Sequence, residues 1–151
     1  MFLKESTSIG LRVLLYLGSH KNPGPARVPA LMDIVNSSKS TMHKLLKFMV
    51  KQGWIVSHRG RYGGYELDER VLDIGLGTIV EILERDRHVI DCTKMECPFR
   101  NTLCPFIEPM DAASTQFYKE LNHTTVRDLI EKRLSIEHNS TQIIKLKKSR
   151  S

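Results

Sequence analysis

Three cysteines within one short stretch are the residues of this chain whose types and spacing best suit chemistry. Cys92, Cys97 and Cys104 are the only cysteines among 151 residues, and four and then six residues separate them. Thiolates that converge on one point bind soft metal ions or iron–sulfur clusters. Residues 86–107 lack the apolar periodicity of a core element, so we expect an irregular loop that could bring the three sulfurs together.

Spacing alone leaves four interpretations of these cysteines open. They could be three buried, inert thiols, although the surrounding stretch does not resemble a core element. They could hold structural zinc, but such sites want four ligands, and no C-x2-C pair with a downstream ligand pair occurs. Two of the three could form a redox-active disulfide. The fourth interpretation is an iron–sulfur cluster, whose negative charge Lys94 and Arg100 could balance.

A second stretch, residues 38–52, has the pattern of a helix that enters the major groove of DNA. Apolar side chains recur there at helical spacing, at Met42, Leu45, Leu46 and Met49. The opposite face gathers Ser40, Lys44, Lys47 and Lys51, and no acidic residue interrupts 37–52. A merely solvated helix is the alternative, although like charges crowded on one face repel one another. We expect DNA contacts from Ser38, Ser40, Thr41, His43, Lys44 and Lys47.

The residues after this helix predict a two-stranded hairpin, or wing. Gly53 would end the helix as a C′ residue, and the short runs 54–56 and 65–67 have the composition of strands. The glycine-rich run 60–64 between them would form the turn. Arg59 and Arg61 then lie at the tip, where a guanidinium can enter a minor groove. Both are therefore predicted DNA contacts.

The remaining elements would hold these two stretches in place. We expect a first helix over 5–20, capped by Ser6 or Thr7, and a short helix over 29–35 that leads through a turn to Ser38 as the next N-cap. Helices over about 74–84, from 109, and over 125–134 would follow, the last with Thr124 or Thr125 and Asp128 in a capping box. The predicted fold class is mainly α with a small β wing: a winged helix-turn-helix plus a long dimerisation helix.

This pattern divides the chain into four parts. Residues 1–84 form the winged helix-turn-helix DNA-binding domain, 85–107 the cysteine loop, 108–134 the dimerisation helices, and 135–151 a polar, basic, flexible tail. Apolar residues at intervals of three and four from residue 110 to residue 121 predict a stripe on a projecting helix. Such a stripe is usually buried against a second copy, so we expect a homodimer.

The charge of the chain is distributed unevenly along it. The formal net charge is +6, but residues 1–70 carry 11 Lys and Arg against 5 Asp and Glu, whereas residues 71–142 carry 8 against 12. The basic half is the predicted helix-turn-helix half, as expected if it faces phosphates. No apolar run is long enough for a membrane span and no secretory signal is evident, so we expect a cytoplasmic protein without membrane contact.

Enzyme chemistry is not indicated by any pattern in the sequence. It contains no paired carboxylates, no nucleophile–base constellation and no phosphate-binding loop. A non-specific architectural protein is a further alternative, because a basic face alone binds any nucleic acid.

Taken together, these motifs resemble the Rrf2 family of bacterial winged helix-turn-helix regulators over residues 1 to about 133. The resemblance rests on the Ile-Gly-Leu-Arg run within 8–12, the wing from Arg59 to Tyr65, the 74–84 helix, the cysteine loop and residues 121–129. The Cys-Pro pairs and their spacing look nearest to the NsrR-type nitric-oxide-sensing repressors, with the RirA-type iron regulators close behind.

The resemblance implies a homodimeric repressor that binds a palindromic operator in double-stranded DNA. It also implies one iron–sulfur cluster per subunit, with 4Fe-4S favoured and 2Fe-2S possible, on the ligands Cys92, Cys97 and Cys104. Loss or nitrosylation of that cluster would weaken DNA binding, so the cluster would sense nitric oxide, redox state or iron. A cluster-free zinc- or thiol-based stress regulator of the same fold is the alternative.

The fourth cluster ligand departs from the family pattern. NsrR-type proteins resemble one another in an aspartate that the first helix gives to the partner subunit's cluster, and Ser8 stands at that position here. IscR-type proteins use a histidine where this chain has Ile107. Glu5, one helical turn before Ser8, is the substitute candidate, donated across the dimer. Asp91, His88, water or no fourth ligand are the alternatives.

Overall fold

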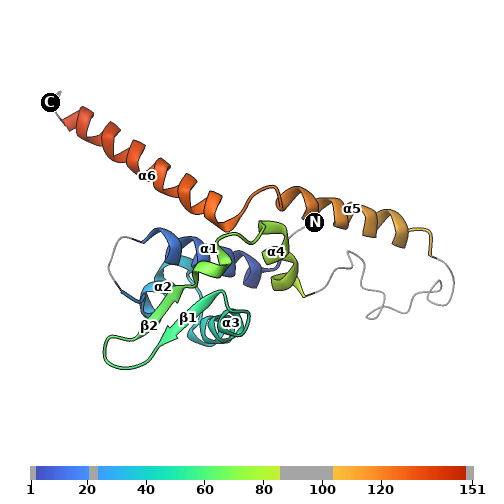
Figure 1. The fold of residues 1–151 in the computed structure, drawn as a ribbon, viewed down its shortest axis with the longest axis horizontal. Helices are drawn as coiled ribbons and strands as arrows, with labels where there is room; N and C mark the ends of the chain where they lie inside the picture. Colours follow the sequence, from blue (N-terminus) through green and yellow to red (C-terminus); the bar gives the residue numbers. More distant parts are fainter. Residues whose placement is uncertain (1–2, 21–23, 86–103, 149–151) are drawn as a thin grey trace.

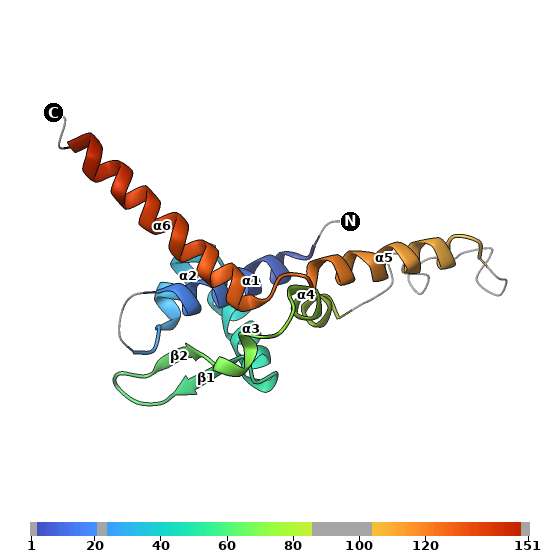
Figure 2. The same cartoon turned by 45° about the horizontal axis from the view of Figure 1, so that its top comes forward.

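A computed structural model of the chain describes residues 3–20, 24–85 and 104–148, with side chains placed as far as residue 138. The elements in chain order are α1 (Glu5–Ser19), α2 (Val28–Val35), α3 (Lys39–Lys51), β1 (Ile55–His58), β2 (Gly64–Leu67), the short 3-10 helix η1 (Glu69–Val71), α4 (Leu76–Glu84), α5 (Ile107–Leu121) and α6 (Val126–Lys148). Helices α1 to α4 and the hairpin form one body, from which α5 and α6 extend in opposite directions (Figures 1 and 2). The predicted fold class, mainly α with a small β wing, is confirmed.

The core lies where α1, α2, α3 and α4 meet the inner side of β1. The predicted apolar stripe of α3 is buried there, with Met42, Leu46 and Met49 fully inaccessible to solvent. They pack in one cluster with side chains from the other elements, including Val13, Leu31, Ile55, Val71 and Ile79. Each such side chain contributes about 1.5–3 kcal/mol when it leaves water. The buried side of α3 therefore fixes which face the helix shows to solvent.

Two glycines let α5 approach the start of α4. A Cβ on Gly77 would lie 2.0 Å from the carbonyl oxygen of Tyr118, and a Cβ on Gly75 would lie 2.3 Å from Oδ1 of Asn122. The same Asn122 oxygen accepts a hydrogen bond from the Thr78 N–H at 2.9 Å, so it caps α4 from a distant part of the chain. This contact explains why α4 begins at Leu76, two residues after the expected start.

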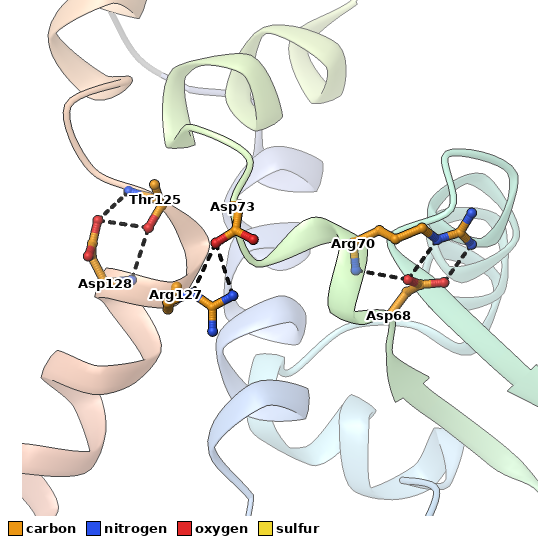
Figure 3. A network of polar contacts seen from close by, with 6 residues as sticks. All are labelled: Asp68, Arg70, Asp73, Thr125, Arg127 and Asp128. Carbon is orange, nitrogen blue, oxygen red and sulfur yellow. Dashed lines mark hydrogen bonds and ion pairs between the residues drawn. The ribbon is translucent and has the colours of Figure 1, made fainter.

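Polar contacts fix the start of α6 to the body of the fold (Figure 3). The Thr125 N–H donates to Asp128 Oδ2 at 2.8 Å, and the Asp128 N–H donates to Thr125 Oγ1 at 3.2 Å, so the predicted capping box is confirmed. The bond from the Thr125 N–H, and then the bond that the Thr125 hydroxyl donates to the same carboxylate oxygen at 2.7 Å, lower the pKa of the Asp128 carboxyl. Arg127 Nε donates to Asp73 Oδ1 at 3.0 Å and ties α6 to the turn before α4.

A similar pair follows the wing. Arg70 donates through its guanidinium to both carboxylate oxygens of Asp68, at 2.9 and 2.7 Å (Figure 3). These hydrogen bonds hold the pKa of Asp68 at about 2, below its ordinary value of 3.8. The backbone N–H of Asp68 also donates to the Trp54 carbonyl at 2.9 Å, which anchors the end of β2 beside the start of β1.

Two further features differ from the prediction: the N-cap of the first helix and the end of the last helix. The N-cap of α1 is Lys4 rather than Ser6 or Thr7, and no side chain caps that helix, because a lysine side chain has no hydrogen-bond acceptor. The Lys4 N–H donates to Glu84 Oε1 at 2.8 Å. The last helix, expected to end at 134, continues to Lys148, so 135–148 are helical rather than a flexible tail. No Gly or Pro occurs between 126 and 148 to end it. None of the helices in the described ranges is long and apolar enough to cross a membrane.

Candidate nucleic-acid interface

Helix α3 presents the cationic face that its sequence predicts. The six predicted contacts on it are all exposed: Ser38, Ser40, Thr41, His43, Lys44 and Lys47. Among the residues that the structure describes, no carboxylate forms an ion pair with Lys44 or Lys47. Their charges are therefore available to an external anion rather than compensated within the fold.

The turn before α3 is built from local side-chain chemistry. Asn36 ends α2 in the left-handed conformation (φ 49°), which an asparagine adopts more readily than most residues. Ser38 Oγ then accepts from the Thr41 N–H at 3.2 Å, and its hydroxyl donates to Thr41 Oγ1 at 2.9 Å. The predicted N-cap is confirmed. It leaves an exposed, partly uncapped helix start, where backbone N–H groups can bind a phosphate.

The wing is a two-stranded antiparallel hairpin, with β1 paired to β2 from Ile55 opposite Leu67 to His58 opposite Gly64. Gly60 takes a φ of 104° in the turn, which a residue with a side chain rarely adopts. Arg59 and Arg61 lie in that turn and are both exposed, as predicted. No described carboxylate pairs with either guanidinium, so both can reach a nucleic acid.

A contact that was not predicted fastens the wing to the segment before α2. The N–H of Ala26 donates to the Tyr65 carbonyl, and the Tyr65 N–H donates back to the Ala26 carbonyl, both at 2.9 Å. A Cβ on Gly64 would lie 2.5 Å from the Ala26 oxygen, which explains a glycine there. The wing is therefore held against the helix-turn-helix at its base, while its tip remains exposed.

The wing tip gains two further residues that were not predicted. Arg27, the N-cap of α2, donates to the carbonyl oxygen of Arg61 at 3.3 Å, so a third arginine lies beside the predicted pair. The Arg61 guanidinium lies 5.8 Å from the centroid of the Tyr62 ring, which is 75% exposed. Only the pairing of Ala26 with Tyr65, a non-local contact, brings Arg27 to this place.

The predicted cluster ligands fall mostly outside the described residues. Cys92 and Cys97, and the alternative ligands Asp91 and His88, lie in 86–103, and the described Cys104 is half-buried just before α5. Across the described ranges, no three His, Cys, Asp or Glu side chains are grouped as metal ligands. Glu5 is exposed in the first turn of α1, Ser8 is half-buried one turn later, and Ile107 begins α5.

The start of α1 does contact the end of α4. The Lys4 N–H donates to Glu84 Oε1 at 2.8 Å. Glu5 is the next residue after Lys4, and Glu84 is the last residue of α4, shortly before the cysteine segment. The Lys4 ammonium also donates to the Glu84 carbonyl oxygen, so two hydrogen bonds within one subunit join the start of α1 to the residue near which the cysteine segment begins. The assignment of Glu5 as a ligand stays a prediction.

Comparisons with known proteins place this fold in a family. A family model described as Rrf2, iron-dependent transcriptional regulator, matches residues 3–132. Protein rrf2 of Nitratidesulfovibrio vulgaris (strain Hildenborough) is 29% identical over 132 residues, which cover 86% of this chain and 87% of that protein.

Two solved structures are similar in fold. CymR (YrzC), described as the global cysteine regulator of B. subtilis, has 26% identity and a TM-score of 0.61, covering 87% of this chain and 98% of that one. T. potens IscR has 18% identity and a TM-score of 0.66, covering 88% of each chain. Because the family model spans most of the sequence and the described winged helix, the chain belongs to the Rrf2 family of transcriptional regulators, whose winged helix binds DNA.

Proposed function

We propose that this protein is a homodimeric, sequence-specific repressor whose affinity for DNA is controlled by an iron–sulfur cluster. The observation that supports DNA binding best is the exposed face of α3, whose lysines have no described acidic partner, beside a wing that carries Arg59 and Arg61. Helix α3 enters the major groove, where Ser40 and His43 can reach base edges. The wing arginines reach the flanking minor groove.

Homodimerisation is supported by apolar side chains that one subunit leaves in solvent. On α5 the buried side chains are Ser114 and Tyr118, whereas Ile107 and Met110 are exposed. On α6, beyond the part that packs on α1, Leu134 and Ile136 are exposed as well. A second copy would cover these faces. Two copies of α3 would then read a palindrome whose half-sites lie about 34–36 Å, one turn of DNA, apart or a multiple of it.

The cluster is supported by three thiols of suitable spacing and by the iron dependence in the family's description. Cys92, Cys97 and Cys104 would hold it, with Glu5 of the partner subunit as the candidate fourth ligand. A bound cluster would supply iron that reacts with nitric oxide or oxidants. The rival is a cluster-free zinc- or thiol-based regulator of the same fold.

Replacing Lys44 with alanine tests the α3 face. If Lys44 neutralises one backbone phosphate, the variant should bind all duplexes more weakly, and the slope of log K against log salt should fall by about one per subunit. Fluorescence anisotropy titrations at four or five salt concentrations measure both quantities. Lys132→Ala, an exposed lysine on α6, is the matched control, and an equal slope in the two variants would contradict the assignment.

A footprint separates the proposed repressor from a non-specific architectural protein. A specific dimer should protect one palindromic site and bind it at least about a thousandfold more tightly than random duplex. Uniform protection at the same affinity would instead favour the architectural alternative.

A further inference from the structure

A cleft beside α3 carries two cations, Lys4 and Arg85, that the proposed interface does not use. It has a volume of about 400 Å³ and lies between the start of α1, the flank of α3 and the end of α4. Its polar lining consists of three cations, Lys4, Lys44 and Arg85, two hydroxyls, Ser6 and Thr41, and one acid, Glu84. Thr41 and Lys44 belong both to this cleft and to the predicted DNA-binding face, so the two surfaces are continuous.

The single acid of the cleft is already neutralised. Glu84 is only 6% exposed, and its carboxylate accepts the Lys4 N–H at 2.8 Å and pairs with the Lys4 ammonium at 3.8 Å. The same ammonium also donates to the Glu84 carbonyl oxygen. Because Lys4 and Glu84 cancel, Lys44 and Arg85 leave the cleft with a net positive charge that suits an anion.

Arg85 is held in place by an unusual local arrangement. It ends α4 in the left-handed conformation (φ 58°), which is uncommon for a residue other than Gly or Asn. Its guanidinium lies over the ring of Phe48 on α3, with the central carbon 4.6 Å from the ring centroid. Stacking on a ring face leaves the N–H edge of a guanidinium able to donate. The N–H groups of the Arg85 guanidinium therefore lie beside α3, next to Phe48.

The position of the cleft matches the wall of a major groove. At about 100° per residue, Thr41 and Phe48 fall between the cationic face of α3 and its buried stripe. A helix roughly 10–12 Å across nearly fills a groove about 12 Å wide, so the flanks of the helix face the phosphates on either side. In both overall views α3 lies between the hairpin and α4 (Figures 1 and 2). The wing and the cleft therefore lie on opposite sides of α3.

We propose that this cleft is a second backbone-contact site, which binds a phosphodiester of the DNA strand on the side of α3 away from the wing. Arg85 and Lys44 supply the charge, and the hydroxyls of Ser6 and Thr41 donate to the phosphate oxygens. The proposal rests on the proposed DNA-binding function, because it takes α3 to lie in the major groove.

The test uses two matched pairs of variants in the full-length protein. Ser6→Glu puts a carboxylate into the cleft at the first turn of α1, where an acid favours the helix, and Ser135→Glu adds the same charge at an exposed serine of α6. Because Ser135 lies between Leu134 and Ile136, sedimentation velocity checks that this variant keeps the oligomeric state of the wild type. Arg85→Gln and Arg133→Gln each remove one exposed arginine charge. Thermal unfolding checks that each variant is folded, and anisotropy titrations with operator and random duplexes measure binding.

We expect Ser6→Glu to weaken binding to both duplexes by on the order of tenfold, and Ser135→Glu by less than about twofold. Arg85→Gln should lower the salt slope by about one per subunit, and Arg133→Gln should leave it unchanged. If the two variants of each pair have equal effects on DNA binding, the cleft does not bind a DNA phosphate. The same result is expected if the cleft binds only a small free anion.

The wing variant Arg59→Ala/Arg61→Ala distinguishes failure of the proposed DNA interface from failure of the cleft site alone. If it weakens binding while Ser6→Glu and Arg85→Gln behave as their controls, the DNA interface stands and the cleft site is wrong. If wild-type protein binds neither duplex, both are wrong.

Discussion

Replacing Arg59 and Arg61 together with alanine is expected to weaken operator binding by about a hundredfold for each subunit of the dimer. Both guanidiniums are exposed at the wing tip without a described acidic partner. A charge-assisted hydrogen bond is worth about 1.5–3 kcal/mol, so losing two removes at least about 3 kcal/mol, or two powers of ten. Neither side chain is part of the core, so the variant should fold normally. Fluorescence anisotropy at fixed salt measures the change.

The control for the wing variant removes two charges elsewhere. Lys132→Ala/Arg133→Ala on α6 lowers the net charge equally and so reports the long-range electrostatic effect. Because Arg133 pairs with Glu137 at 2.8 Å, beside the proposed dimer face, sedimentation velocity checks that the control keeps the oligomeric state of the wild type. Affinity that is the same in the wing variant and this control would remove the wing from the interface.

Leu46→Ala is expected to cost about 2–5 kcal/mol of unfolding free energy. Leu46 is fully buried in the cluster that joins α3 to α1, α2 and α4, and truncation leaves a cavity. Against a typical total of about 5–15 kcal/mol, this loss would leave much of the protein unfolded under mild denaturation. Urea unfolding followed by far-ultraviolet circular dichroism measures it.

The neighbouring substitution Lys47→Ala is the control for stability. Lys47 is exposed on the opposite face of α3, so its loss should change the unfolding free energy by no more than about 0.5 kcal/mol. A loss below about 1 kcal/mol for Leu46→Ala would show that α3 is not held by the described core.

The parts of the fold that could be predicted are those set by local sequence. The 3.6-residue spacing of Met42, Leu46 and Met49 determined the buried side of α3 and hence its exposed face. Ser38 and the Thr125–Asp128 pair identified two helix starts, because capping is chemistry between residues three positions apart. The wing followed from a glycine-rich turn between two β-forming runs.

The parts that could not be predicted depend on contacts between distant residues. Nothing local indicates that Ala26 pairs with Tyr65 and brings Arg27 to the wing tip. The stacking of Arg85 on Phe48 is non-local in the same way. The first helix begins at residue 5, as predicted, but local capping rules favoured Ser6 or Thr7 as its N-cap, whereas Lys4 holds that position and meets Glu84, 80 positions away.

The candidate metal site and the candidate DNA-binding face are supported by different kinds of observation. The exposed lysines of α3 follow from periodicity, and the structure brings them together. The spacing of three thiols is compatible with several chemistries, and two of the three lie outside the described residues. Family resemblance therefore carries the preference for a cluster, whereas residue geometry carries the preference for DNA.

The most direct test of cluster-controlled DNA binding is a titration of operator DNA with protein purified without oxygen, before and after exposure to nitric oxide. Absorbance and iron content are measured on the same samples. The account predicts coloured protein with one cluster per subunit, and affinity that falls by roughly 5–150-fold once the cluster has reacted. Colourless, iron-free protein that binds the operator at full strength, with no response to nitric oxide, would contradict it.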